Sequence, residues 1–166
     1  MPTHIIILRH GKAERDSPSR GDDDRALQPR GRYQSEYIAD SLADLLLHPT
    51  LIVSSPILRA KTTAEIIAKA LKTDLLIDDR LSTRHDEGDH FACLRDHAEV
   101  HADAGARIML VGHNPTLSTL AAQLIAKNPL KWSGELRTGE ALVLESPSVR
   151  LASATLTHTL RLDRDD

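Results

Sequence analysis

Three short segments of the sequence place phosphate-binding or nucleophilic side chains directly after a run of apolar residues. In the first, the run Ile5–Leu8 is followed by Arg9, His10 and Gly11. A short run rich in β-branched residues is typical of a strand buried on both faces. A guanidinium binds phosphate through parallel hydrogen bonds, an imidazole attacks or moves protons near neutral pH, and glycine lets the backbone approach a bound group. The segment therefore predicts an anion site where a buried strand ends.

The second segment joins the apolar run Leu51–Val53 to a turn that contains Ser55 and Pro56. We expect Ser55 to cap a helix whose first residue is Pro56, since Ser is a favoured N-cap and Pro suits the first helical position. Arg59 then lies one turn inside the helix and can point back toward the sheet edge. Helix N-termini attract anions, so Arg59 stands where phosphate would be bound, although taken alone it is an ordinary surface arginine.

The third segment is the apolar run Ile108–Val111, which leads into a glycine and then His113, Asn114 and Pro115. Asn114 is a suitable N-cap and Pro115 a suitable first residue for the helix that follows. His113 precedes this helix, and the positive end of the helix dipole disfavours imidazolium there. A neutral His113 could hydrogen-bond a phosphate group or stabilise a group in transfer.

The three segments predict a single site if their strands are parallel neighbours. The carboxyl ends of such strands meet at one edge of the sheet, which is where ligands bind in open α/β sheets. Arg9, His10, Arg59 and His113 would then line one pocket. That set suits a tetrahedral phosphate, with two cations for its oxygens, one histidine to attack it and one to bind it.

The remaining patterns alternate between strands and helices. Pro29 suits the first turn of a helix whose apolar stripe is Ile38, Leu42, Leu45 and Leu46 and which His48-Pro49 ends. A modest helix is expected around Phe91, Leu94 and Ala98, and another over residues 117–125. Further strands are expected at 75–77, 141–144 and 154–162, the last as an exposed or edge strand because Thr and Leu alternate. Between residues 132 and 139, Trp132, Gly134, Thr138 and Gly139 belong to a loop that could border the pocket.

Composition narrows the class of protein. A chain of 166 residues suits a single domain spanning residues 1–166. The formal net charge of −3 gives no general attraction to nucleic acid or to an anionic membrane. The single cysteine, Cys93, excludes an internal disulfide and fits a reducing compartment. No secretory signal or membrane-spanning run is recognisable, so we expect a cytoplasmic protein.

Two groups of polar residues resemble metal ligands, but we interpret them as solvent-exposed side chains. The acidic run Asp22–Asp24 is expected to be a solvated loop tip, because nothing in the sequence orients it. His90, His97 and His101 are expected to lie mostly on the surface, since a zinc site needs a compact and convergent ligand set. We therefore predict no metal and no other cofactor.

With these residues in view, the sequence resembles the histidine phosphatase superfamily, the phosphoglycerate-mutase-like fold. The resemblance rests on Leu8–Gly11, on Ser55–Ala60 with Thr62–Ala64, and on Val111–Pro115. The short length and the pattern from Arg9 to Glu14 followed by Leu27–Gly31 resemble the SixA subgroup of phosphohistidine phosphatases. The implied fold is a three-layer α/β/α sandwich with a mostly parallel sheet.

The resemblance also implies roles for individual residues. His10 would be the nucleophile that becomes phosphorylated, and Arg9, Arg59 and His113 would bind and neutralise the phosphoryl group. Gly11 and Ser55 are added to the predicted phosphate-binding set. Metal is unnecessary in this scheme because guanidinium groups supply the positive charge.

The substrate is less closely defined by the sequence. Larger members carry a carboxylic acid that protonates an oxygen leaving group, and only Asp86 and Glu87 fall in the corresponding region, within a different motif. Weak acid machinery favours phosphohistidine, whose nitrogen leaving group needs less protonation. The predicted partner is thus a phosphohistidine-bearing signalling or phosphotransfer protein, or alternatively a small phosphorylated metabolite. A non-catalytic phosphate-binding module is the third alternative.

Overall fold

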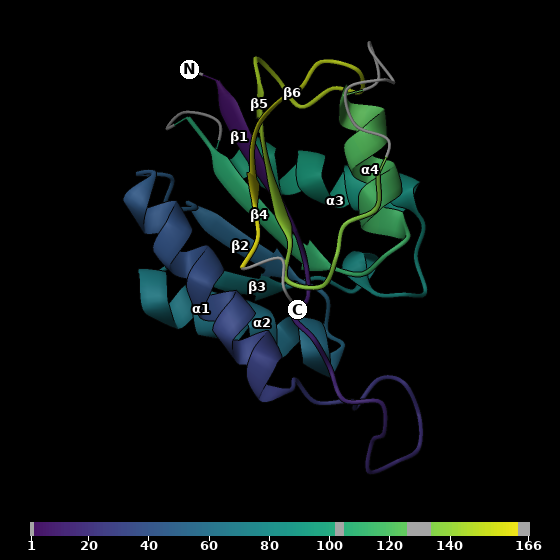
Figure 1. Cartoon of the computed structure of the whole chain (residues 1–166). Coiled ribbons are helices and arrows are strands. Elements are labelled where there is room, and N and C mark those ends of the chain that lie inside the picture. Colours follow the sequence, from purple (N-terminus) through teal and green to yellow (C-terminus); the bar gives the residue numbers. More distant parts are fainter. Residues whose placement is uncertain (1, 102–104, 126–133, 163–166) are drawn as a thin grey trace.

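A single sheet lies at the centre of the computed structural model, which describes residues 2–101, 105–125 and 134–162. Its strands are β1 (Thr3–Arg9), β2 (Leu51–Ser54), β3 (Leu75–Ile77), β4 (Arg107–Gly112), β5 (Ala141–Ser146) and β6 (Thr155–Leu160). Within the described ranges the spatial order is β3-β2-β4-β1-β5-β6 (Figure 1). The first four strands in this order are parallel, whereas β5 and β6 each pair antiparallel with their neighbour. The predicted mostly parallel sheet is confirmed, and β6 is an edge strand as expected.

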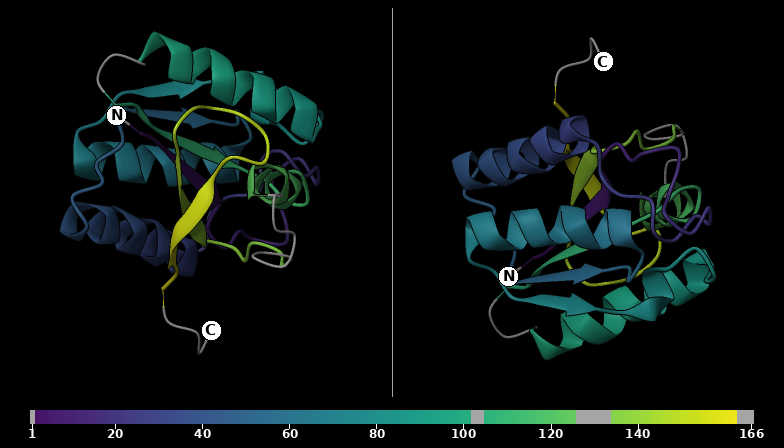
Figure 2. Two further views of the ribbon diagram at one scale, coloured as in Figure 1. Left: turned by 90° about the horizontal axis from the view of Figure 1, so that it is seen from above. Right: turned by 90° about the horizontal axis from the view of Figure 1, so that it is seen from below.

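Helices cover both faces of the sheet. They are α1 (Pro29–Asp44), α2 (Leu58–Leu71), α3 (Glu87–Val100) and α4 (Thr116–Ile125), with the short 3₁₀ helix η1 (Asp79–Leu81) after β3. The helices α1 and α2 lie on one side of the sheet and α3 and α4 on the other (Figures 1 and 2). This is the predicted three-layer α/β/α arrangement. Among the described residues, no helix is long and apolar enough to cross a lipid bilayer.

The apolar run of β1 explains why this strand lies at the heart of the sheet. Successive side chains of a strand point to opposite faces. Ile5 and Ile7 pack in the cluster formed with α3 and α4, whereas Ile6 and Leu8 pack in the cluster formed with α1 and α2. All four side chains are fully buried. A continuous apolar run is therefore what a strand covered on both faces requires.

The strands that carry the predicted site are adjacent. The strand β4 lies between β1 and β2 and is parallel to both. Arg9 at the end of β1 is level with Gly112 at the end of β4, and Ser54 at the end of β2 is level with Val111. The expectation that three strand ends meet at one edge of the sheet is thus confirmed.

The end of α1 differs from the expectation. The helix starts with Pro29 at its first position, as predicted, but it ends at Asp44. Leu46 then adopts a left-handed conformation, with φ of 58°. Its N–H donates to Ala43 O and the N–H of Leu47 to Leu42 O, which is the pattern of a Schellman helix terminus.

The predicted apolar stripe of α1 is accordingly wrong at its last two positions. Leu45 is 38% exposed and Leu46 is 78% exposed, because the helix has ended before them. Leu47 packs against the core in their place. Leucine rarely adopts the left-handed conformation, so the sequence offered no sign of this terminus.

The prediction for His90 is also wrong. This side chain is fully buried, whereas His97 and His101 are partly exposed. His90 lies one helical turn from Leu94 and two from Ala98, so it shares the buried face of α3 with them. Burial lowers the pKa of His90.

Two glycines allow α1 to approach the end of β1. A Cβ atom on Gly31, in the first turn of α1, would lie 2.3 Å from the backbone oxygen of Lys12. A Cβ atom on Gly11 would lie 2.6 Å from the backbone oxygen of Gly31. Since both contacts are with backbone atoms, a side chain at either position would push α1 away from the segment that follows β1.

Replacing Gly31 by alanine tests this close approach. Alanine normally stabilises a helix by about 1 kcal/mol relative to glycine. Here we expect Gly31→Ala to lower the free energy of unfolding in urea by about 1–3 kcal/mol, because the backbone must shift. Gly134→Ala is the control, since nothing lies within 4 Å of its added Cβ atom. A Gly31→Ala protein as stable as the wild type would contradict the account.

Candidate active site

The predicted site residues meet at one cavity of about 490 Å³. Arg9 ends β1 and is followed by His10, His113 follows β4, and Arg59 lies in the first turn of α2. All four side chains line the cavity, so the structure brings together the set that the sequence singled out. The lining consists of Arg9, His10, Lys12, Ala13, Arg25, Gln34, Arg59, Thr83, His113, Asn114, Arg137, Thr138 and Arg161.

The hydrogen bonds of His10 define which of its ring nitrogens is available. Nδ1 lies 2.7 Å from the carbonyl oxygen of Gly11. A carbonyl only accepts, so Nδ1 carries a proton and donates it. In the neutral ring Nε2 then keeps its lone pair, and it accepts a hydrogen bond from Arg59 Nε at 3.3 Å.

The surroundings of His10 keep its ring neutral. The side chain is 6% exposed. Burial is the main cause that lowers the pKa of His10 to about 4; the Gly11 hydrogen bond opposes it, and the positive charges of Arg59 and Arg9 lower the pKa further. At neutral pH the imidazole is therefore in the form that can attack phosphorus.

His113 is held by Ser55. Its Nε2 lies 2.8 Å from Ser55 Oγ, and that oxygen also accepts the N–H of Ile57 at 3.1 Å. Burial, followed by the charges of His10 and Arg59, lowers the pKa of His113 to about 3. The ring centres of His113 and His10 are 5.3 Å apart. Within the described part of the chain, His113 Nδ1 has no hydrogen-bond partner.

Ser55 thus positions a site residue, but it does not cap α2. The N-cap of α2 is Ile57, and the helix begins at Leu58 rather than at Pro56. The predicted start of α4 is likewise displaced: the helix begins at Thr116, after a cis peptide bond between Asn114 and Pro115. The side chain of Asn114 instead donates to Leu136 O and accepts from Ser118 Oγ, both at 2.6 Å.

The guanidinium of Arg59 is bound by an aspartate of the acidic run Asp22–Asp24, for which the sequence predicted no partner. Its two terminal nitrogens donate to the backbone oxygen and to a carboxylate oxygen of Asp22, each at 2.8 Å. Partial burial alone would raise the pKa of Asp22, but the hydrogen bond and charge of Arg59 outweigh it and lower the pKa. Asp22 is exposed, with a side-chain exposure of 55%, as expected of a solvated loop, but the expectation that nothing orients it is wrong.

Asp22 belongs to the loop of residues 10–28 between β1 and α1, which extends from the sheet at the lower right of Figure 1. The next residue fastens the same loop, because Asp23 O accepts the N–H of Leu58 and its carboxylate pairs with Arg84 at 3.0 Å. A pairing between Ala13 and Leu27 closes the base of the loop. The loop therefore lies against the N-terminus of α2, beside Arg59.

A second loop segment is anchored on β1. Arg9 donates through one terminal nitrogen to Leu136 O at 3.1 Å. The N–H of Gly139 donates to the carbonyl oxygens of Arg9 and His10. These bonds explain how the loop around Thr138 comes to border the cavity, which the sequence left open. Trp132, in the same predicted loop, lies outside the described residues.

The other predicted site residues have structural partners. The N–H of Gly11 donates to Thr63 Oγ1 at 3.0 Å, so it is not directed at a ligand in the cavity. Asp86 is the N-cap of α3 and accepts the N–H of Asp89, and Glu87 is the first residue of that helix. Neither carboxylate lines the cavity, which Thr83 reaches instead. The structure therefore does not bring the candidate acids to His10.

Known proteins share this fold and this sequence pattern. A family model for the histidine phosphatase superfamily (branch 1) matches residues 5–86. A crystal structure of the "putative phosphohistidine phosphatase SixA" from Agrobacterium tumefaciens is similar with a TM-score of 0.77 and 27% sequence identity, covering 98% of this chain and 100% of that chain. The chain belongs to the histidine phosphatase superfamily. The resemblance predicted from the sequence is confirmed.

Proteins with similar sequences differ in how much of the chain they match. An uncharacterized protein of Picosynechococcus is 32% identical over 152 residues, which cover 91% of this chain and 90% of that protein. The probable phosphoglycerate mutase GpmB of Escherichia fergusonii is 35% identical over 79 residues, 46% of this chain but only 36% of the mutase. Of these two proteins, the one that matches over nearly the whole length has no named activity, and the one with a named activity matches less than half of this chain.

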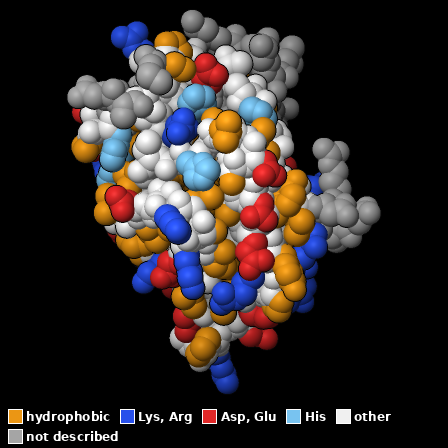
Figure 3. All heavy atoms as spheres, turned by 90° about the vertical axis from the view of Figure 1, so that its left-hand side faces the viewer, with side chains coloured by type: hydrophobic (Ala, Val, Ile, Leu, Met, Phe, Trp, Pro, Cys, Tyr) orange, Lys and Arg blue, Asp and Glu red, His pale blue; other side chains and the backbone are white. Residues whose placement is uncertain are grey.

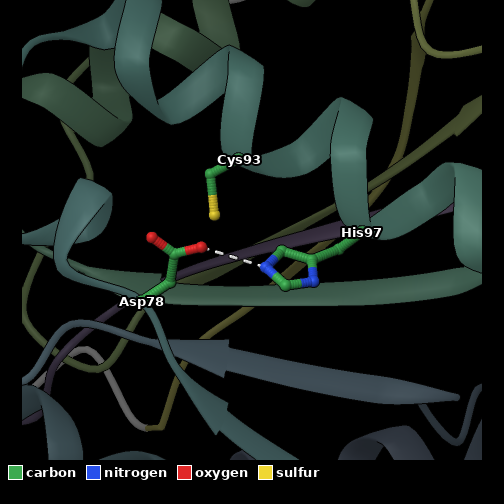
Figure 4. A group of neighbouring side chains, drawn as sticks. All are labelled: Asp78, Cys93 and His97. Atoms are coloured by element: carbon green, nitrogen blue, oxygen red, sulfur yellow. Dashed lines mark hydrogen bonds and ion pairs between the residues drawn. The ribbon is translucent and has the colours of Figure 1, made fainter.

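A second polar cluster of this histidine phosphatase lies between β3 and α3. Asp78, Cys93 and His97 offer ligand atoms within 4.8 Å of one another (Figure 4). A carboxylate provides about four acceptor positions, and those of Asp78 are taken by three bonds from Arg80 and one from His97. Burial raises the pKa of the Cys93 thiol to about 12, so the thiol is protonated. Hydrogen bonding accounts for this cluster, and we assign it no metal.

The neutral state of His10 can be measured directly. We expect the ring to stay unprotonated as the pH falls from 7 and to titrate near pH 4, because burial and two nearby guanidiniums oppose the imidazolium. Its Cε1–H resonance in NMR spectra recorded across this range gives the midpoint, with His10→Asn assigning the signal. A midpoint near 6.5, the ordinary value for histidine, would contradict the geometry.

The contact between Asp22 and Arg59 predicts a competition with phosphate. We expect Asp22→Asn to strengthen binding of inorganic phosphate about twofold to fivefold, the effect of removing one partly exposed charge from an anion site. Calorimetric titration measures the affinity. Asp24→Asn is the matched control, because Asp24 bonds Ser19 rather than Arg59. Equal effects of the two substitutions, or weaker binding by Asp22→Asn, would contradict the competition.

Proposed function

We propose that this protein is a phosphohistidine phosphatase in which His10 attacks the phosphoryl group and transfers it to water. The observation that carries the proposal is the lone pair of His10 Nε2, which lies beside the Arg59 guanidinium in a ring held neutral at physiological pH. A nucleophile and a cation in contact at the edge of a cavity are what covalent phosphoryl transfer requires.

Binding of the phosphoryl group is assigned to Arg9, Arg59 and His113. Both guanidiniums reach the cavity and can donate to phosphoryl oxygens. For Arg59, substrate oxygens take over the donors that Asp22 occupies. We assign the hydroxyl proton of Ser55, whose Oγ accepts the N–H of Ile57, to His113 Nε2. His113 then carries its ring proton on Nδ1, which is buried and has no hydrogen-bond partner within the described residues.

The reaction proceeds in two transfers. In the first, His10 Nε2 forms a bond to phosphorus while the bond from phosphorus to the substrate nitrogen breaks. The positive charge that develops on the His10 ring is stabilised by the Nδ1–H bond to Gly11 O. In the second, water attacks phosphorus, its proton passes to solvent, inorganic phosphate leaves, and the electron pair returns to Nε2.

The proposed leaving group suits a site without a positioned acid. A phosphohistidine whose other ring nitrogen is protonated loses neutral imidazole, so no protein group needs to donate a proton. A phosphate ester instead releases an alkoxide, which a general acid must protonate. Asp86 and Glu87 lie outside the cavity lining, which supports phosphohistidine over an ester. The similar SixA structure supports it as well.

A substrate comparison tests the proposal. We measure kcat/KM for a phosphohistidine peptide and for a panel of sugar and nucleotide phosphates, all with a chelator present because guanidiniums supply the positive charge. The peptide should be the best substrate by at least about tenfold. His10→Asn should lower turnover by about 10³-fold or more, the scale seen when a nucleophile is removed. His158→Asn, on the edge strand β6, is the control.

Three outcomes would count against the proposal. A sugar or nucleotide phosphate preferred over the peptide would replace it with an esterase, the alternative that the partial similarity to GpmB represents. Absence of turnover on every substrate would indicate a phosphate-binding module. Full activity of His10→Asn would remove His10 from the nucleophile position.

A further inference from the structure

The charge of the cavity departs from that of the whole chain. The sequence holds 21 Lys and Arg against 24 Asp and Glu. Among the described residues, the side chains that line the cavity include six cations and no carboxylate. The cations are Arg9, Lys12, Arg25, Arg59, Arg137 and Arg161. On the face seen in Figure 3, by contrast, acidic and basic side chains are interspersed. The positive charge is therefore concentrated where substrate enters.

This charge exceeds what one phosphoryl group uses. Arg9 and Arg59 are the inner pair assigned to phosphoryl oxygens. Arg25 bonds the Asp22 carboxylate at 3.0 Å and Glu14 O at 3.0 Å, so its guanidinium serves the loop. Lys12 and Arg137 differ, because both residues are exposed and, within the described ranges, their side chains form no hydrogen bond or ion pair. Two cations at the cavity mouth are thus left for another anion.

The backbone under these two cations is built around one buried side chain. Gln34 is 2% exposed. Its Oε1 accepts the N–H of Lys12 at 2.8 Å, and its Nε2 donates to Thr138 O at 3.2 Å. Thr138 follows Arg137 directly, so a single amide holds both segments of the rim. The positions of Lys12 and Arg137 around the mouth are therefore set by the fold.

Gly139 allows the segment that carries Arg137 to pack directly against Gln34. Its φ is +70°, and a Cβ atom there would lie 2.7 Å from the side chain of Gln34. Its N–H also bonds the carbonyl oxygens of Arg9 and His10. The rim that carries Arg137 is consequently tied to the same backbone that presents the nucleophile. A group bound at the rim would keep a fixed relation to His10.

We propose that Lys12 and Arg137 form a rim subsite that binds carboxylates flanking the phosphohistidine of a partner protein. The proposal rests on the proposed function, because a histidine that reaches His10 brings its neighbouring residues over the mouth of the cavity. Exposed Lys and Arg there attract acidic neighbours and repel basic ones. The partner is therefore a protein whose phosphohistidine lies on an acidic surface.

Two short phosphohistidine peptides test the subsite. In one, glutamates flank the phosphohistidine on both sides, and in the other glutamines replace them. For the wild type we expect kcat/KM to be about threefold to tenfold higher on the acidic peptide at an ionic strength of about 0.01 M, where charges are weakly screened. The preference should largely vanish at about 1 M.

Substitutions of Lys12 and Arg137 test whether these residues cause the preference for the acidic peptide. Lys12→Ala and Arg137→Ala should each reduce the preference for the acidic peptide, and the double variant should abolish it. Lys69→Ala, an exposed position in the last turn of α2, removes the same charge elsewhere and should keep the preference. Inorganic pyrophosphate is included as a small substrate with two anionic groups.

The outcomes separate this inference from the proposed function. Equal rates on the two peptides, or a preference that survives in the double variant, would overturn the rim subsite while leaving a phosphohistidine phosphatase. Pyrophosphate turned over faster than the acidic peptide, with loss in the double variant, would overturn the protein partner in favour of a small bisphosphate. Failure on both peptides with turnover of metabolite esters would remove the proposed function itself.

Discussion

The hydrogen bond from His10 Nδ1 to the carbonyl oxygen of Gly11 is the constraint on which the site depends. It decides the tautomer of the ring, and therefore which nitrogen faces Arg59. The helix α1 packs closely on the residues beside this bond, because neither Gly11 nor Gly31 has a Cβ atom at their contact. The N–H of Gly139 fixes the neighbouring carbonyl of His10 from the other side. A helix, a loop and a strand end thus converge to orient one imidazole.

Burying positive charge in the site costs solvation free energy, which hydrogen bonds from the surrounding structure offset. Buried guanidiniums need acceptors, and both terminal nitrogens of Arg59 find them on Asp22, in the loop between β1 and α1. Burial, assisted by the same cations, disfavours imidazolium and keeps the His10 ring neutral. In the proposed mechanism, the guanidiniums that bind the phosphoryl group therefore also favour the neutral ring of His10.

The fold and the central residues could be predicted because their signals are local. Three apolar runs are each followed shortly by an arginine or a histidine, and parallel strands bring such ends together. What escaped prediction depends on contacts between distant residues: Asp22 meets Arg59 across 37 positions and Gln34 meets Thr138 across 104. No local pattern marks such pairs. The end of α1 at Leu46 was not predicted for a different reason, since Leu46 adopts a left-handed backbone conformation that leucine disfavours.

The most direct test is to identify which ring nitrogen of His10 becomes phosphorylated. The enzyme is mixed with a phosphohistidine peptide, quenched rapidly into alkali to preserve phosphoramidates, and examined by NMR coupling between phosphorus and ¹⁵N-labelled histidine. The account predicts phosphorus on Nε2, because Nδ1 is committed to Gly11. A phosphoryl group on Nδ1, or on a residue other than His10, would contradict it.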